Sequence, residues 1–123
     1  MLTPIAYSLA VILDLLVLFI GGRFLLQPRA AAAAYGVPAA PGGDAAYLTI
    51  KALRDGSCGI LGLALLAFAG ARAEAWYMLV VALLPLGDTV IVLRHGGPKA
   101  AAFGIHFATA VVVLASAALL FAV

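Results

Sequence analysis

The sequence predicts an all-α integral membrane protein, a four-helix bundle whose helices run alternately up and down. Hydrophobic residues fill 67% of the 123 positions and charged residues only 10%, and the mean hydropathy is +1.23. These values lie far from those of soluble domains. About 20 apolar residues cross the hydrocarbon core as a helix, and the chain has room for four such segments. We therefore predict one membrane domain over residues 1–123, multi-pass in the cell membrane, with the lipid bilayer as its main partner.

Breaks in the apolar pattern place the four spans at residues 3–26, 45–70, 74–95 and 99–123. The first span ends before Pro28. The following stretch, residues 27–44, is rich in Ala, Pro and Gly, which predicts a short interfacial turn at residues 30–34 and an N-cap at Asp44. The connections at residues 71–72 and 96–98 are tight turns, so neighbouring spans should run antiparallel.

Basic residues near the span ends predict the orientation. Arg23, Arg29, Arg94 and Lys99 flank the first and third connections, whereas the second has only Arg72. Basic residues favour the cytoplasmic side, so we expect both termini to be extracytoplasmic. Residues 1–13 carry no basic side chain, so we also expect an N-terminus that is retained rather than cleaved as a signal peptide.

Ionisable residues inside the spans are the candidate site. Each costs about 2.5–3.5 kcal/mol at the bilayer centre unless it finds a partner. At a rise of about 1.5 Å per residue, four of them lie at similar depths of roughly 9–14 Å from the cytoplasmic side. This layer contains Asp14, Asp55, Asp88 and His106.

Helical periodicity turns these residues toward one another. In the second span Lys51, Asp55 and Cys58 share a face with Gly59 and Gly62, and Arg54 lies at its edge. Small residues beside charges allow membrane helices to approach closely. We expect Arg54 to form a salt bridge with Asp55, Asp88 or Asp14, because an unpaired guanidinium at this depth is costly.

Four spaced motifs resemble those of a known family. They are Lys51-Ala-Leu-Arg54-Asp55, Pro85-Leu-Gly-Asp88, Arg94-His95-Gly96-Gly97 and Gly104-Ile-His106. Over nearly the whole chain the sequence is similar to small four-helix bacterial and fungal membrane proteins catalogued as a domain of unknown function. The resemblance implies a four-helix membrane fold and no particular activity. A looser similarity to DoxX-like four-helix membrane proteins rests on Gly21-Gly22-Arg23 and implies no function.

The first functional hypothesis is general acid–base catalysis on a lipophilic small molecule, such as an isomerisation, a cyclisation or an epoxide opening. Two carboxyl groups in different environments can divide the acid and base roles. Asp55 and Asp88 would be the acid and base, Arg54 would hold negative charge, and His106 would tune or relay the proton. The residues given supporting or substrate-binding roles are Asp14, Lys51, Tyr47 and Cys58.

Three alternatives stay open at this point. Asp14 is the deepest acid, and it would suit a proton- or ion-coupled carrier working within a homodimer. The second alternative is a non-catalytic accessory subunit. The third is that the charges form a structural ion-pair network that fixes helix register. A ligand at Asp88 would favour the enzyme. Access to Asp14 from both sides of the membrane would favour the carrier, and a dry, fully paired network would favour the subunit.

Several chemistries have no pattern here. The chain has no Walker-type glycine loop, GxSxG elbow, HExxH pair or CxxCH haem site. The single cysteine, Cys58, has no second cysteine to pair with. The net charge of +2 is small and scattered, which argues against nucleic-acid binding. We expect no metal and no cofactor.

Overall fold

The computed structural model describes all residues from Met1 to Val123, and it is all-α. Four segments are long and apolar enough to cross a membrane: Leu2–Leu26, Ala45–Ala69, Ala71–Arg94 and Lys99–Ala122. The chain is therefore a multi-pass, membrane-type helical protein. The third segment begins at Ala71, three residues before the predicted start. Glu74, the first residue of the predicted span, therefore lies inside the helix.

Only the first of these segments is one unbroken α-helix, α1 (Leu2–Leu26). The second is α3 (Ala45–Ala64) followed by a π-helical turn, η1 (Leu65–Ala69). The third divides into α4 (Ala71–Val81) and α5 (Leu83–Arg94). The fourth contains α6 (Lys99–Ala101), a π-helical segment η2 (Ala102–Phe107) and α7 (Ala108–Ala122).

Proline chemistry explains the division of the third segment. Pro85 has no N–H to bond the carbonyl of Val81, and its ring crowds that carbonyl, so the regular helix is interrupted at Ala82. The Thr89 hydroxyl donates a hydrogen bond of 2.8 Å to the carbonyl of Pro85, one turn earlier in the helix. From Leu83 onward α5 is unbroken and carries Asp88 on its second turn.

The first connection is more regular than a turn. Residues Pro28–Tyr35 form a helix, α2, with proline at its first position and Gly36 as a left-handed C-cap at φ 100°. Asp44 does occupy the N-cap position of α3 but makes no side-chain cap. Its carboxylate instead accepts a 2.9 Å hydrogen bond from the Ala40 amide, because Asp44 itself has a left-handed backbone at φ 66°.

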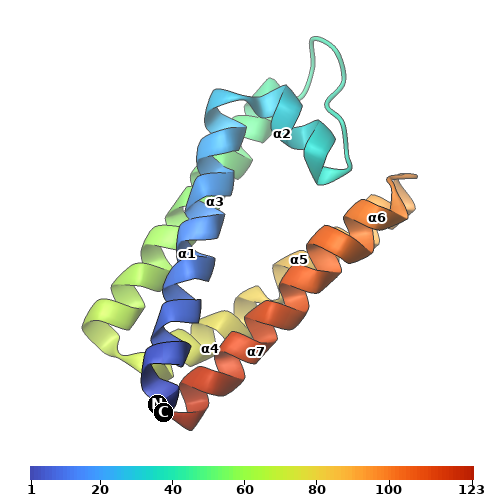
Figure 1. Cartoon of the computed structure of the whole chain (residues 1–123). Coiled ribbons are helices and arrows are strands. Elements are labelled where there is room, and N and C mark those ends of the chain that lie inside the picture. The colour runs from blue at the N-terminus through green and yellow to red at the C-terminus, as the bar shows by residue number, and fades with distance from the viewer.

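Figure 1 shows both termini together at one end, with α2 and α6 at the opposite end. From the terminal end, α1 with α3 and α5 with α7 diverge like two arms. The way the spans cross a membrane, and the side on which the termini lie, stay predictions.

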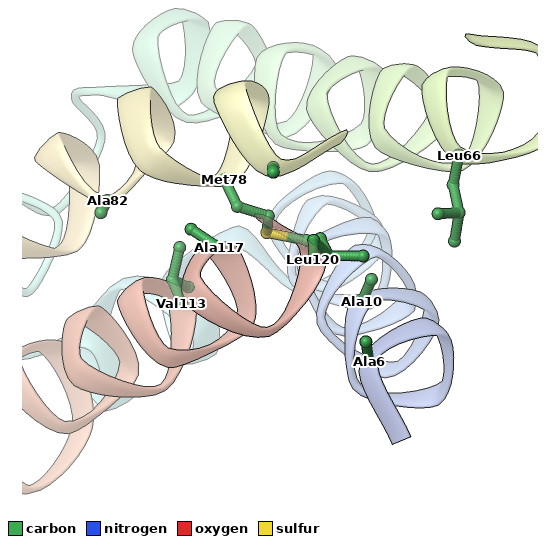
Figure 2. Close-up of a cluster of buried hydrophobic side chains, with 9 residues drawn as sticks. Ala6, Ala10, Leu66, Met78, Ala82, Val113, Ala117 and Leu120 are labelled. Carbon is green, nitrogen blue, oxygen red and sulfur yellow. The ribbon is translucent and has the colours of Figure 1, made fainter. Parts of the chain in front are cut away.

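Near the termini the two arms share a compact core (Figure 2). Nine buried residues form it: Ala6, Ala10, Leu66, Ala75, Met78, Ala82, Val113, Ala117 and Leu120. Alanines allow the backbones to approach, and Met78 and Leu120 fill the space between them. Along the first arm, Gly21 packs against Gly56 and Ala52 of α3, where a Cβ would lie only 2.6 Å from the Gly56 nitrogen. Large apolar side chains such as Phe19, Leu53 and Phe68 remain exposed, as lipid contact requires.

Candidate functional site

A cavity of about 340 Å³ lies between the two arms. Sixteen of its 24 lining residues are hydrophobic, and its volume falls within the range of small-molecule sites. Its α1 wall runs from Leu13 to Phe24, and α2 contributes Ala31, Ala34 and Tyr35. The lining residues with titratable side chains are Asp14, Arg23, Tyr35, Lys51, Asp55, Cys58, Tyr77, Asp88 and His106.

The last residue of α2, Tyr35, connects the first arm to the second. Because α2 ends there, the Tyr35 carbonyl has no partner within the helix. His106 of η2 supplies one, with its Nε2 2.7 Å from that oxygen. A carbonyl only accepts hydrogen bonds, so Nε2 carries the proton and, in the neutral ring, Nδ1 is the basic nitrogen. The two rings also pack against each other at a tilt of 58°, with centroids 4.1 Å apart.

The phenol of the same tyrosine reaches Asp88 of α5, to whose Oδ2 it donates a hydrogen bond. Burial of Tyr35, followed by the negative charge of Asp88, raises the pKa of the phenol above its ordinary value. The phenol therefore stays neutral and acts as a fixed donor to the Asp88 carboxylate. This contact joins residues 53 positions apart in the sequence.

Lys51 of α3 forms the ion pair of the site. Its Nζ lies 2.9 Å from Oδ2 of Asp55, one turn further along the same helix. The ammonium group also lies 4.4 Å from the centroid of the Tyr35 ring and 4.9 Å from that of Phe24. Both rings present their electron-rich faces to the cation. Aromatic contacts and Asp55 together therefore hold a positive charge against an apolar cavity.

The histidine belongs to an irregular part of its helix. His106 is 3% exposed and lies in η2, where the backbone has a π-helical pattern. Such segments add a residue to the turn, redirect side chains, and occur often at functional sites. No local sequence pattern predicts this segment.

Two buried acids, Asp14 and Glu74, form a second polar cluster near the N-terminal end of the cavity wall that α1 provides. Asp14 is 1% exposed and Glu74 of α4 is fully buried. Their carboxyl groups lie near each other, although Oδ2 of Asp14 and both carboxyl oxygens of Glu74 have no hydrogen-bond partner. Nearby, the Tyr77 hydroxyl donates to the backbone carbonyl of Cys58. The packing is tight, because Gly62 lies directly against the Asp14 carboxyl.

The structure brings six of the eight predicted site residues to the cavity, namely Asp14, Lys51, Asp55, Cys58, Asp88 and His106. Arg54 and Tyr47 do not line it, and both are exposed. The predicted salt bridge of Arg54 is wrong, since the ion pair of this cluster belongs to Lys51. The physical reason is the rotation of α3: Gly59 and Gly62 face α1, which turns the Arg54 position outward. Tyr47 lies in the first turn of α3, before the helix reaches the cavity.

Sequence reasoning missed Tyr35 and Glu74. Tyr35 lies just after the short turn predicted at residues 30–34, although Gly36 directly after a run of helix formers is a usual sign of a helix end. Glu74 was taken as the start of a span, although an acid flanked by apolar residues within a membrane segment calls for a partner. The structure groups no three His, Cys, Asp or Glu side chains as metal ligands. The expectation of no metal or cofactor stays a prediction.

Comparison with known proteins identifies a family. A family model described as Domain of unknown function (DUF4267) matches residues 15–120. The match covers most of the chain, including every titratable residue of the cavity except Asp14. The chain belongs to this family. No curated protein and no solved structure matches it.

Proposed function

We propose that this member of the DUF4267 family binds a lipophilic small molecule in its membrane cavity and performs general acid–base chemistry on it. The observation that carries the proposal is the grouping of Asp55, Asp88 and His106 on the wall of one largely apolar cavity. An apolar pocket with a few convergent polar groups is the usual form of a small-molecule site. Purely structural charges do not require a cavity beside them.

The position of the cavity supports entry from the bilayer. Four of its lining side chains are exposed, so the cavity is not sealed from its surroundings: Leu16, Phe19, Leu84 and Ile105. An apolar molecule dissolved in the hydrocarbon region can therefore reach the cavity laterally without crossing water. This geometry favours a lipophilic ligand over a water-soluble one.

The polar groups divide into two pairs with different roles. Asp88 receives a hydrogen bond from the neutral Tyr35 phenol, and this arrangement suits a base that takes a proton while the phenol stabilises nearby negative charge. Asp55 is paired with Lys51, whose ammonium replaces Arg54 as the cation of the site. His106 is fixed through Nε2 and acts on the orientation of Tyr35. An isomerisation, cyclisation or epoxide opening needs this combination of base, donor and fixed charge.

A proton-coupled carrier that uses Asp14 is the second candidate. Asp14 lines the cavity and is almost fully buried, as a coupling acid in mid-membrane would be. This function needs access to Asp14 from both sides of the membrane and is expected of a homodimer. A non-catalytic accessory subunit would need no ligand at all.

The test begins with the molecule that copurifies with the protein in mild detergent, identified by mass spectrometry of an organic extract. Wild-type protein should convert this molecule or its precursor. The Asp88→Asn variant should bind it without turnover, because an amide keeps the shape of the carboxyl group but cannot exchange protons in the same way. Asp44→Asn is the matched control, since this carboxylate is exposed and does not line the cavity. Conversion by Asp88→Asn at the wild-type rate would contradict the assignment.

A further inference from the structure

We infer that Asp14 and Glu74 form a proton-binding site, separate from the Asp88 and Asp55 pairs, which exchanges protons with the cavity through Asp14. The inference does not depend on the chemistry proposed for Asp88. It concerns two acids, of which one was assigned only a supporting role from the sequence and the other was not recognised.

Both acids are removed from solvent and lack fixed donors. Asp14 is 1% exposed and Glu74 is 0% exposed. Oδ2 of Asp14 and both carboxyl oxygens of Glu74 have no hydrogen-bond partner in good geometry. Yet the two carboxyl groups are close enough to interact with each other. Buried polar atoms without partners are rare in native proteins and call for an explanation.

No cation neutralises the pair. The salt bridge between Lys51 and Asp55 is the one ion pair of the protein, so neither Asp14 nor Glu74 takes part in one. On α3 the nearest groups are the backbone at Gly59 and Gly62, and the Cys58 carbonyl already accepts the Tyr77 hydroxyl. The other helices that pack here bring no basic group: η1 and α7 contain no titratable residue.

Two ionised carboxylates in this environment would repel each other without compensation, in a medium where each charge is already costly. A proton held between them removes one charge and supplies the missing donor. It satisfies an otherwise unpartnered oxygen and converts the repulsion into a hydrogen bond. The ligand of the site is therefore a proton.

The two acids differ in their access to the cavity. Asp14 lines it and Glu74 does not. The remaining negative charge is better placed on Asp14, beside the cavity, so the shared proton rests on Glu74. A second proton binds to the Asp14 carboxylate from the cavity side and forms one O–H bond. Its release to the cavity breaks that bond and restores the carboxylate.

The composition of the chain allows a direct test, because Glu74 is its only glutamate. Wild-type protein carrying glutamate labelled with ¹³C at the side-chain carboxyl gives one carboxyl NMR signal, with no variant needed for assignment. In lipid nanodiscs at neutral pH this signal should have the chemical shift of a protonated acid. A signal at the position of a carboxylate would overturn the inference.

Coupling to Asp14 is tested by the pH dependence of the same signal. Two interacting acids titrate as a unit, so the Glu74 signal should move when Asp14 takes up its proton. Asp14→Asn should abolish that step, and the control Asp44→Asn should keep it. A pH profile that is the same in Asp14→Asn and wild type would overturn the pairing. A signal that changes when Na⁺ is exchanged for N-methylglucamine at constant pH would show a metal-cation site instead of a proton site.

Discussion

Replacing Gly21 with alanine tests how closely α1 and α3 approach beside the cavity. A Cβ at this position would lie 2.6 Å from the Gly56 nitrogen and 2.9 Å from the Ala52 carbonyl oxygen, whereas ordinary van der Waals contact begins at 3.4 Å. The two backbones must therefore separate by about 0.8 Å, and a gap of this size loses a quarter to a half of the dispersion energy of the contacts around it.

The magnitude follows from two opposing terms. Overpacking costs about 1–3 kcal/mol, and the upper end applies at Gly21 because the contacted atoms belong to backbone and cannot rotate away. Alanine has a better helix propensity than glycine by about 1 kcal/mol, which offsets part of this. The free energy of unfolding of Gly21→Ala should therefore fall by about 2 kcal/mol.

Gly22→Ala is the matched control, because nothing lies within 4 Å of a Cβ built at that position. It should leave stability unchanged or raise it by up to about 1 kcal/mol. Both variants can be unfolded by titrating SDS into mild-detergent micelles, with far-UV circular dichroism as the readout. Equal stability of the two variants would refute the close approach of α1 and α3 at Gly21.

Three further predictions concern the polar groups. Arg54→Ala should change the free energy of unfolding by less than about 0.5 kcal/mol, because the side chain is exposed and unpaired. A loss of several kcal/mol in the SDS titration would contradict this and indicate that Arg54 is buried and paired. Lys51→Met should cost about 1–3 kcal/mol, since it leaves the Asp55 carboxylate without its cation, and adding Asp55→Asn should recover much of the loss. Because the pKa of Tyr35 is raised, the folded protein keeps a proton that the unfolded chain releases above pH about 10. The stability that Tyr35 contributes is therefore complete below that pH and declines as the pH rises, by at most about 1.4 kcal/mol per pH unit. Tyr35→Phe should make this decline shallower in thermal melts followed between neutral and alkaline pH, and an unchanged slope would contradict the assignment.

The membrane fold could be predicted because its signal is local. Twenty apolar residues in a row indicate a span without any knowledge of neighbouring helices. The break at Ala82 also has a local cause, since Pro85 acts on its own helix. Glycines facing a neighbouring helix, such as Gly59 and Gly62, were recognised from helical periodicity alone.

The pairing of side chains could not be predicted with the same rules. Periodicity placed Arg54 at the edge of the charged face, and a small rotation of α3 decided that Lys51, rather than Arg54, meets Asp55. The contact of His106 with the Tyr35 carbonyl spans 71 residues and depends on where α2 ends and on the π-helical backbone of η2. These features arise from packing between the arms, which the local sequence does not encode.

The central claim is that the cavity between the arms holds a lipophilic molecule, and its occupancy is the measurement that tests this claim most directly. Val17→Trp places a large ring on the cavity wall, whereas Leu15→Trp places the same ring on the exposed side of α1. Both proteins and wild type are purified in the same mild detergent, and the copurified molecule is quantified per mole of protein by mass spectrometry. We predict that wild type and Leu15→Trp retain the molecule and that Val17→Trp loses it while remaining folded. Equal retention by all three proteins would contradict the claim and place the molecule outside the cavity.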